Sequence, residues 1–203
     1  LGDVYKRQSI ITINFTASET IKGDVTVTIL DQGADNITNL DGNFWRATYT
    51  IQDEDETEGE VEFIISFSDL AGNTNTHTAT TDGSSVEYDR TPSELTSIIT
   101  QSDHINPEWA RVASLITIEF EANESIEFVT AKVNNRNATV EYSDEDEVWY
   151  AYYYMRTTDT EGFVTFSIEF KDLAGNISDT SRISTVFFDK TKPLFDSVSI
   201  YSN

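Results

Sequence analysis

Apolar side chains alternate with polar ones along several short stretches of the chain. The alternation is clearest in residues 11–17, 25–29, 45–51 and 61–67. A period of two places successive side chains on opposite faces of a β-strand. One face of each strand is then buried and the other wet, as in an antiparallel sandwich. No stretch of useful length has a helical period, so the sequence predicts an all-β protein.

The pattern occurs twice. Three landmarks recur in the same order: Ile11–Ala17 with Ile116–Ala122, Trp45 with Trp149, and Asp69–Asn73 with Asp172–Asn176. Their offsets are 105, 104 and 103 residues. Chance matches would not keep order and spacing together, so the chain contains a duplicated domain.

The second copy predicts seven strands, near 94–101, 114–122, 127–134, 137–142, 147–157, 163–171 and 182–189. Seven short strands at this spacing are typical of an immunoglobulin-like (Ig-like) sandwich. The predicted fold class is therefore two tandem Ig-like antiparallel β-sandwiches. The expected domains are 9–92 and 93–193.

The two copies begin at different points of the repeat. Leu95–Ser102 opens the second repeat, and the first repeat has no such strand before Ser9; residues 1–8 fit no repeat position. Residues 194–203 resemble that opening strand. We expect them to be the first strand of a third repeat from a longer parent array.

Trp45 and Trp149 lie in phase with the inward positions of their strands, in the sequences Trp-Arg-Ala-Thr-Tyr and Trp-Tyr-Ala-Tyr-Tyr. We therefore expect both tryptophans in the core. Tyr150, Tyr152 and Tyr154 then face outward, where the first repeat has Arg46, Thr48 and Thr50. Such a row of tyrosines could stack on sugar rings or on a protein. Ordinary cross-strand pairing on a wet face is the alternative.

Charge narrows the set of partners. The chain has 13 Lys+Arg against 36 Asp+Glu, a formal net charge of −23. This charge repels nucleic acid and anionic membranes and attracts cations. No apolar run approaches the roughly 20 residues that span a bilayer, so we expect no membrane insertion by this fragment.

Catalytic motifs are missing from the sequence. The chain has no cysteine, and its two histidines, His77 and His104, occupy non-equivalent positions, so neither a catalytic triad nor a histidine metal site can be assembled. No phosphate loop, nucleophile elbow or dinucleotide fingerprint occurs. We therefore expect a protein that is not an enzyme.

Several motifs resemble the bacterial Ig-like repeats of large cell-surface adhesins. They are the Glu-Thr-Ile and Glu-Ser-Ile turns at 19 and 124, the two Asp-Leu-Ala-Gly-Asn loops, and the closings Tyr88–Pro92 and Phe188–Pro193. The resemblance covers residues 9–203. It implies an extracellular stalk at the bacterial cell surface, often stiffened by calcium, whose partners are the neighbouring repeats of the same chain. Cell-surface glycans or proteins are the partners of the alternative, a binding module that uses the tyrosine face.

Acidic residues are expected at the junction between the repeats. If the strands alternate in direction, the loops that carry Asp172 and the pair Asn123 and Glu124 face the linker from the first repeat. Asp89 in the linker and the acidic loop that contains Asp53 and Asp55 face them from the other side. Calcium takes six to eight hard oxygen ligands, which carboxylates and amide carbonyls supply. Asp189 is the candidate ligand at the linker position that matches Asp89.

Two interpretations of these acids are open. The first is the calcium site. In the second, the acidic runs are solvated loops, and the Asp and Asn of Asp-Leu-Ala-Gly-Asn close a turn by bonding their own backbone.

Overall fold

The computed structural model describes residues 3–5, 9–52 and 58–202, and for residues 3–5 it describes the backbone alone. The chain divides into two compact units. We call the first, residues 1–91 with the loop 173–176, repeat 1, and the second, residues 92–172 and 177–203, repeat 2. The described residues include no helix, and hence none long and apolar enough to cross a membrane.

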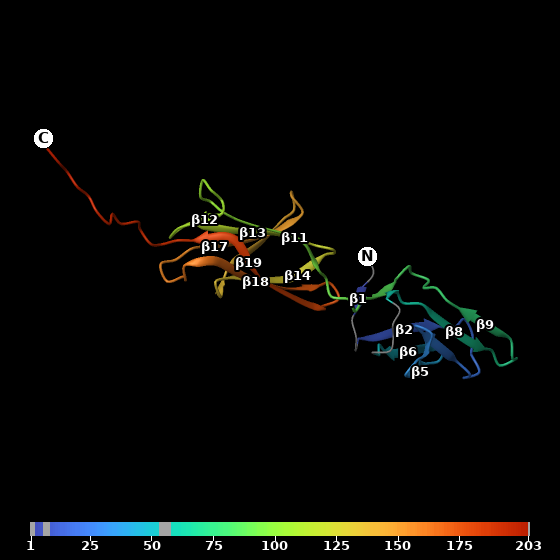
Figure 1. The fold of residues 1–203 in the computed structure, drawn as a ribbon. Helices are drawn as coiled ribbons and strands as arrows, with labels where there is room; N and C mark the ends of the chain where they lie inside the picture. The colour runs from blue at the N-terminus through green and yellow to red at the C-terminus, as the bar shows by residue number, and fades with distance from the viewer. Residues whose placement is uncertain (1–2, 6–8, 53–57, 203) are drawn as a thin grey trace. The chain divides into compact units, whose positions relative to one another are not determined.

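Repeat 1 is built from three sheets (Figure 1). One has the order β2-β6-β5, with β2 at Ile10–Thr16, β6 at Phe44–Thr50 and β5 at Asn36–Asp41. The second has the order β4-β3-β8-β9, formed by Gln32–Gly33, Thr26–Ile29, Phe63–Ser68 and Thr74–His77. The third joins β1 (Asp3–Tyr5), β10 (Val86–Tyr88) and β7 (Gly59–Glu60).

Repeat 2 has two longer sheets. One has the order β11-β13-β17-β16, formed by Leu95–Ser102, Leu115–Ala122, Val148–Tyr154 and Thr139–Ser143. The other has the order β12-β19-β18-β14-β15, formed by Trp109–Ala110, Ile177–Phe188, Gly162–Asp172, Ile126–Val133 and Arg136–Asn137. Within each repeat the inward side chains of the sheets form one core.

Two short strands lie where the sequence predicts none. β1 pairs in parallel with β10, just as β12 pairs in parallel with β19. Residues 3–5 therefore occupy a position of the repeat pattern, although the sequence alone places nothing before Ser9. Two-residue pairings such as that of β12 have no periodicity from which they could be read.

The tryptophans are half-buried rather than central to the core. Trp45 stacks on Phe15 with ring centroids 6.5 Å apart, and Trp149 stacks on Phe120 at the same distance. The fully buried positions of these strands lie further along, at Ala47 and Ala151. The expected phase is correct, but each tryptophan is the second residue of its strand, two residues before the fully buried alanine.

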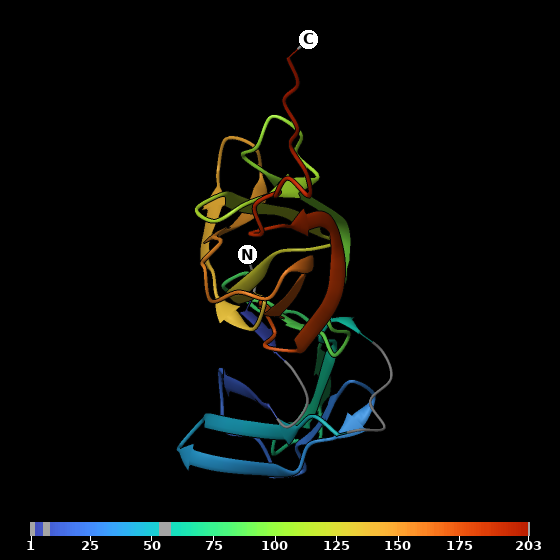
Figure 2. The same ribbon diagram turned by 60° about the vertical axis from the view of Figure 1, so that its left-hand side comes forward.

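Residues 190–202 form no strand. They leave the sandwich of repeat 2 as an extended segment, red in Figures 1 and 2. Their large apolar side chains are exposed to water.

Candidate metal centre

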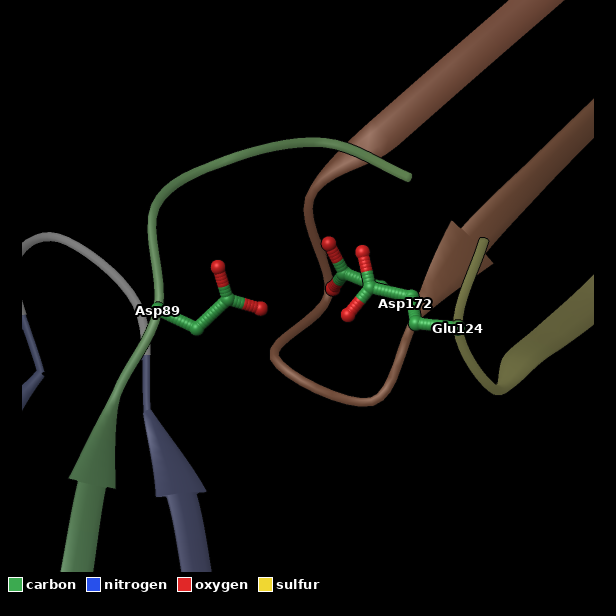
Figure 3. Close-up of side chains that lie close together, drawn as sticks. All are labelled: Asp89, Glu124 and Asp172. Carbon is green, nitrogen blue, oxygen red and sulfur yellow. The ribbon is translucent and has the colours of Figure 1, made fainter. Parts of the chain in front are cut away.

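Two carboxylates of repeat 2 lie side by side (Figure 3). Asp172 is the last residue of β18, and Glu124 lies in the turn before β14. Ile126 at the start of β14 pairs with Asp172, which brings the turn beside the strand end. One oxygen of Glu124 lies within 4.8 Å of one of Asp172.

Burial and charge define the chemistry of this pair. Asp172 is fully buried, whereas Glu124 is exposed. A buried carboxylate loses hydration, and a second carboxylate at this distance adds like-charge repulsion. Hard divalent cations bind oxygen ligands of this kind, so the pair could hold a metal ion.

The matching loop of repeat 1 closes on itself. The Asp69 carboxylate accepts the Asn73 backbone N–H at 2.8 Å and the Asn73 amide N–H at 2.6 Å. The Asn73 side-chain bond, followed by its backbone bond, lowers the pKa of Asp69. This is the turn-closing role that the sequence left open as one interpretation. Gly72 and its counterpart Gly175 have φ of 89° and 85°, which requires glycine at this point of the turn.

The asparagine of the second loop is bonded to the linker. The Asn176 amide donates to the backbone carbonyl of Asp89 at 3.3 Å. Asp89, also labelled in Figure 3, follows strand β10 and is half-buried. Its carboxylate accepts the Thr91 N–H at 2.9 Å, which fixes the start of the linker.

Asn123 holds the first strand of repeat 2. Its side-chain oxygen accepts the Glu94 N–H at 2.8 Å, and its own N–H donates to the Glu94 carbonyl at 2.9 Å. This amide oxygen is therefore engaged with backbone directly before β11.

Of the remaining predicted ligands, Asp189 is the one that the structure describes. Asp189 is exposed, and its carboxylate accepts the Thr191 N–H at 2.8 Å, as Asp89 does with Thr91. Among the described residues, Asp189 belongs to no group of acids close enough to share an ion. Asp53 and Asp55 lie outside the described residues.

A second pair of equivalent acids, missed in the sequence, fixes each linker. Glu58 accepts the Arg90 N–H at 2.9 Å and the Thr91 hydroxyl at 2.8 Å. Glu161 accepts the Lys190 N–H at 2.7 Å and the Thr191 hydroxyl at 2.8 Å. We call these two arrangements the linker clamps. The threonine hydroxyl bond is the largest cause that lowers the pKa of each glutamate. The Glu-Gly pairs at 58 and 161, 103 residues apart, are the signal that could have revealed them.

A buried acid of repeat 2 was also not predicted from the sequence. Asp159 is 2% exposed and accepts the Tyr153 hydroxyl, the Arg156 N–H at 2.7 Å and the Arg136 side chain at 2.9 Å. Burial, followed by the bond to Asp159, raises the pKa of Tyr153. This network ties the loop after β17 to the hairpin of β14 and β15, so its role is structural.

The predicted tyrosine row lies on the outer face of β17. Tyr154 is 63% exposed, whereas Tyr150 and Tyr152 are half-buried and stack with ring centroids 5.9 Å apart. Glu119 and Glu141 pair with Tyr150 from the two flanking strands. The row is therefore an aromatic surface within an acidic face.

Comparison with known proteins shows the fold. A Ca²⁺-stabilized adhesin that helps an Antarctic bacterium reach out and bind ice matches 93% of this chain and 47% of its own length, with a TM-score of 0.54 and 18% identity. Tandem Ig repeats of Dlar match 94% of both chains, with a TM-score of 0.31 and 8% identity. A membrane-anchored protein from Corynebacterium diphtheriae matches 96% of this chain and 54% of its own, with a TM-score of 0.34 and 16% identity.

Only the first of these likenesses has a TM-score above 0.5, and this chain spans about half the length of that adhesin. No family model and no curated protein matches the sequence. The all-β architecture, with facing antiparallel sheets in each of the two units, shows that the chain is two tandem Ig-like antiparallel β-sandwiches.

Proposed function

We propose that this chain is a spacer segment in the stalk of an extracellular bacterial surface adhesin, and that calcium stiffens the junction between its repeats. The proposed role is mechanical and involves no catalysis. Duplicated sandwiches support it, because a row of such domains projects whatever lies beyond it away from a surface. The likeness in fold to a Ca²⁺-stabilized adhesin supports the same role.

The observation that carries the calcium part is the pair of carboxylates at Glu124 and Asp172. We propose Asp89 as the third ligand. It stands three residues before Pro92, the first residue of repeat 2, and the Asn176 amide holds its backbone at 3.3 Å. Backbone carbonyls and water would complete the six to eight oxygens that calcium takes at about 2.3–2.6 Å.

The expected calcium affinity indicates in which compartment the proposed site is filled. Ligands from three separate segments must be ordered together, so we expect binding in the range of extracellular modules, about 10⁻⁴–10⁻³ M. Such a site fills only where calcium is millimolar, outside the cell.

Calorimetric titration of calcium into the full chain tests this proposal. Asp172→Asn should weaken binding at least about tenfold, because one charged ligand is lost from a site of low affinity. Asp69→Asn is the matched control, since it makes the same change in the equivalent loop of repeat 1, and among the described residues Asp69 belongs to no group of acids close enough to share an ion. In the linker, Asp89→Asn should weaken binding and Asp189→Asn should not. No heat in the native chain, or equal losses in both members of a pair, would overturn the calcium site.

One observation favours a second candidate function, a binding module. Repeat 2 carries Tyr150, Tyr152 and Tyr154 where repeat 1 has Arg46, Thr48 and Thr50, so the aromatic row is particular to one repeat. Stacking on sugar rings or on a protein is the chemistry that such a row offers. A glycan array probed with the native chain and with Tyr152→Ser tests it. A glycan signal that Tyr152→Ser abolishes would establish it, and an empty array would leave no glycan role for the row.

A further inference from the structure

Three aromatic side chains lie together on the outer face of the sheet that contains β12, β19 and β18. Phe187 of β19 pairs with Trp109 on one side and with Phe163 on the other. The ring centroids of Trp109 and Phe163 lie 5.3 and 5.2 Å from that of Phe187. Trp109 is 47% exposed and Phe163 59%, while Phe187 is half-buried. These three side chains, which we call the aromatic platform, therefore present apolar ring surface to water.

A hollow of about 340 Å³ lies beside the platform. Thr165 lines it and follows Phe163 by two residues on the same face of β18, so the hollow continues the platform along the strand. Ile183 of β19 pairs with Thr165 and is 72% exposed. The other lining residues are Phe166, Ser167, Ser181, Arg182 and Asn135. The lining is therefore mainly polar, whereas the platform is apolar.

Repeat 1 has acidic residues at the equivalent positions of its own strands. Strand pairing and the shared motifs match four exposed acids of repeat 1 to residues of the platform and the hollow. The matches are Asp31 with Asn135, Glu60 with Phe163, Glu62 with Thr165, and Glu87 with Phe187. The sandwich therefore folds with a carboxylate at each of these positions and does not require the aromatic rings of repeat 2. Exposed apolar surface that the fold does not require is typical of a binding site.

Arg182 gives the hollow a positive charge. Its side chain is exposed, and the ion pairs of the described residues do not include it. A guanidinium binds a carboxylate through two parallel hydrogen bonds. The acids of the same face, Glu169 and Asp179, pair with each other one row beyond the hollow, away from the platform. The hollow thus suits a ligand with one carboxylate, because these two acids repel a second negative group at that end.

We propose that the platform and the hollow together bind a short glycan that contains a carboxylated sugar. One sugar ring stacks on the platform, and the carboxylate of its neighbour binds Arg182. The hydroxyl lining at Thr165, Ser167 and Ser181 favours a glycan over an acidic peptide, because each sugar ring offers several hydroxyls to it. This site lies on the other sheet of repeat 2 from the tyrosine row and needs no calcium.

Two-dimensional NMR of the full chain, titrated with a trisaccharide of galacturonic acid, tests this site. EDTA in the buffer removes divalent cations, so the result is independent of the proposed calcium site. The backbone signals of 163–167 and 181–187 and the indole signal of Trp109 should shift. A trisaccharide of galactose, which has the same ring without the carboxylate, should bind at least about tenfold more weakly, because the charged hydrogen bonds are lost.

Two variants separate the platform from the charge. Phe163→Glu with Phe187→Glu introduces the residues that repeat 1 has at these positions, so the sandwich should still fold and binding of the acidic trisaccharide should be lost. Arg182→Gln should weaken binding at least about tenfold, because the guanidinium is removed. The control, Arg46→Gln, removes one exposed positive charge from repeat 1 and should change the affinity less than about twofold.

Three results would overturn the proposal. The first is the absence of any shift at millimolar trisaccharide, or shifts confined to other surfaces. The second is an unchanged affinity in the variant Phe163→Glu with Phe187→Glu. The third comes from a triglutamate peptide: if it bound as tightly as the acidic trisaccharide and shifted the same signals, the site would recognise carboxylates and not a glycan.

Discussion

The two repeats bury the same apolar positions to different depths. Ile118 and Phe120 of repeat 2 are fully buried, whereas their counterparts Ile13 and Phe15 in repeat 1 are half-buried. The difference follows from one strand, because β11 closes the core of repeat 2 and no described residue takes that place in repeat 1. The first strand of such a sandwich therefore contributes core cover as well as sheet pairing.

The Asp-Leu-Ala-Gly-Asn loops of both repeats hold their asparagine side chains by hydrogen bonds. In repeat 1 the Asn73 amide donates to the carboxylate of Asp69, and in repeat 2 the Asn176 amide donates to the backbone of Asp89. The loop of repeat 2 is thereby bonded to the linker residue.

Truncation of one matched phenylalanine in each repeat should cause the largest difference in stability between the repeats. Phe120→Ala should destabilise repeat 2 by roughly 3–5 kcal/mol, the usual cost of emptying a buried aromatic site. Phe15→Ala should cost repeat 1 only about 1–2 kcal/mol, because its side chain already contacts water. Hydrogen exchange in increasing denaturant, read separately for peptides of each repeat, measures both. Equal losses would show that the missing strand does not weaken the core of repeat 1.

Loss of the buried acid in repeat 2 should have an intermediate effect. Asp159→Ala leaves the Tyr153 hydroxyl and the Arg156 N–H without their acceptor, which costs about 1–3 kcal/mol. Asp179→Ala, an exposed change on β19, is the control and should be near neutral. The same exchange experiment measures both variants. An Asp159→Ala chain as stable as the control would mean that solvent replaces the network.

The smallest expected effect on stability comes from the linker clamps, and it is common to both repeats. Hydrogen bonds from the threonine hydroxyls lower the pKa of Glu58 and Glu161, so the clamps add stability above the ordinary glutamate range. That stability is lost as the pH falls through the lowered values of the folded chain. Thr191→Val should raise the titration midpoint of Glu161 in carboxyl-detected NMR and leave Glu58 unchanged. An unmoved midpoint would show that the hydroxyl bond does not form in solution.

Much of the fold could be predicted from the sequence. Period-two stretches mark the long strands, and the matched landmarks place the core strands of both repeats in register. The short strands β1, β12 and β15 could not be predicted, because two or three residues contain no period. β19 begins at Ile177 rather than near 182, since residues 178–182 pair with β18 through backbone while their side chains are polar.

The candidate site could be predicted only in part. Spacing from the strand ends was enough to select Asp172 and Glu124, because an antiparallel sandwich determines which loops share an end. It could not reveal that the Asn123 side-chain oxygen accepts the Glu94 N–H, because that bond depends on the pairing of the loop with the start of repeat 2. The clamps at Glu58 and Glu161 were missed because a single acid before a glycine looks like any solvated turn.

The distribution of distances between the two repeats shows whether calcium stiffens the junction that we propose. Because the chain has no cysteine, Thr76→Cys and Thr139→Cys place one spin label on an exposed strand position of each repeat. We expect a broad distance distribution in EDTA that narrows in millimolar calcium, and no narrowing when Asp172→Asn is added. An identical width with and without calcium would mean that calcium does not stiffen the junction.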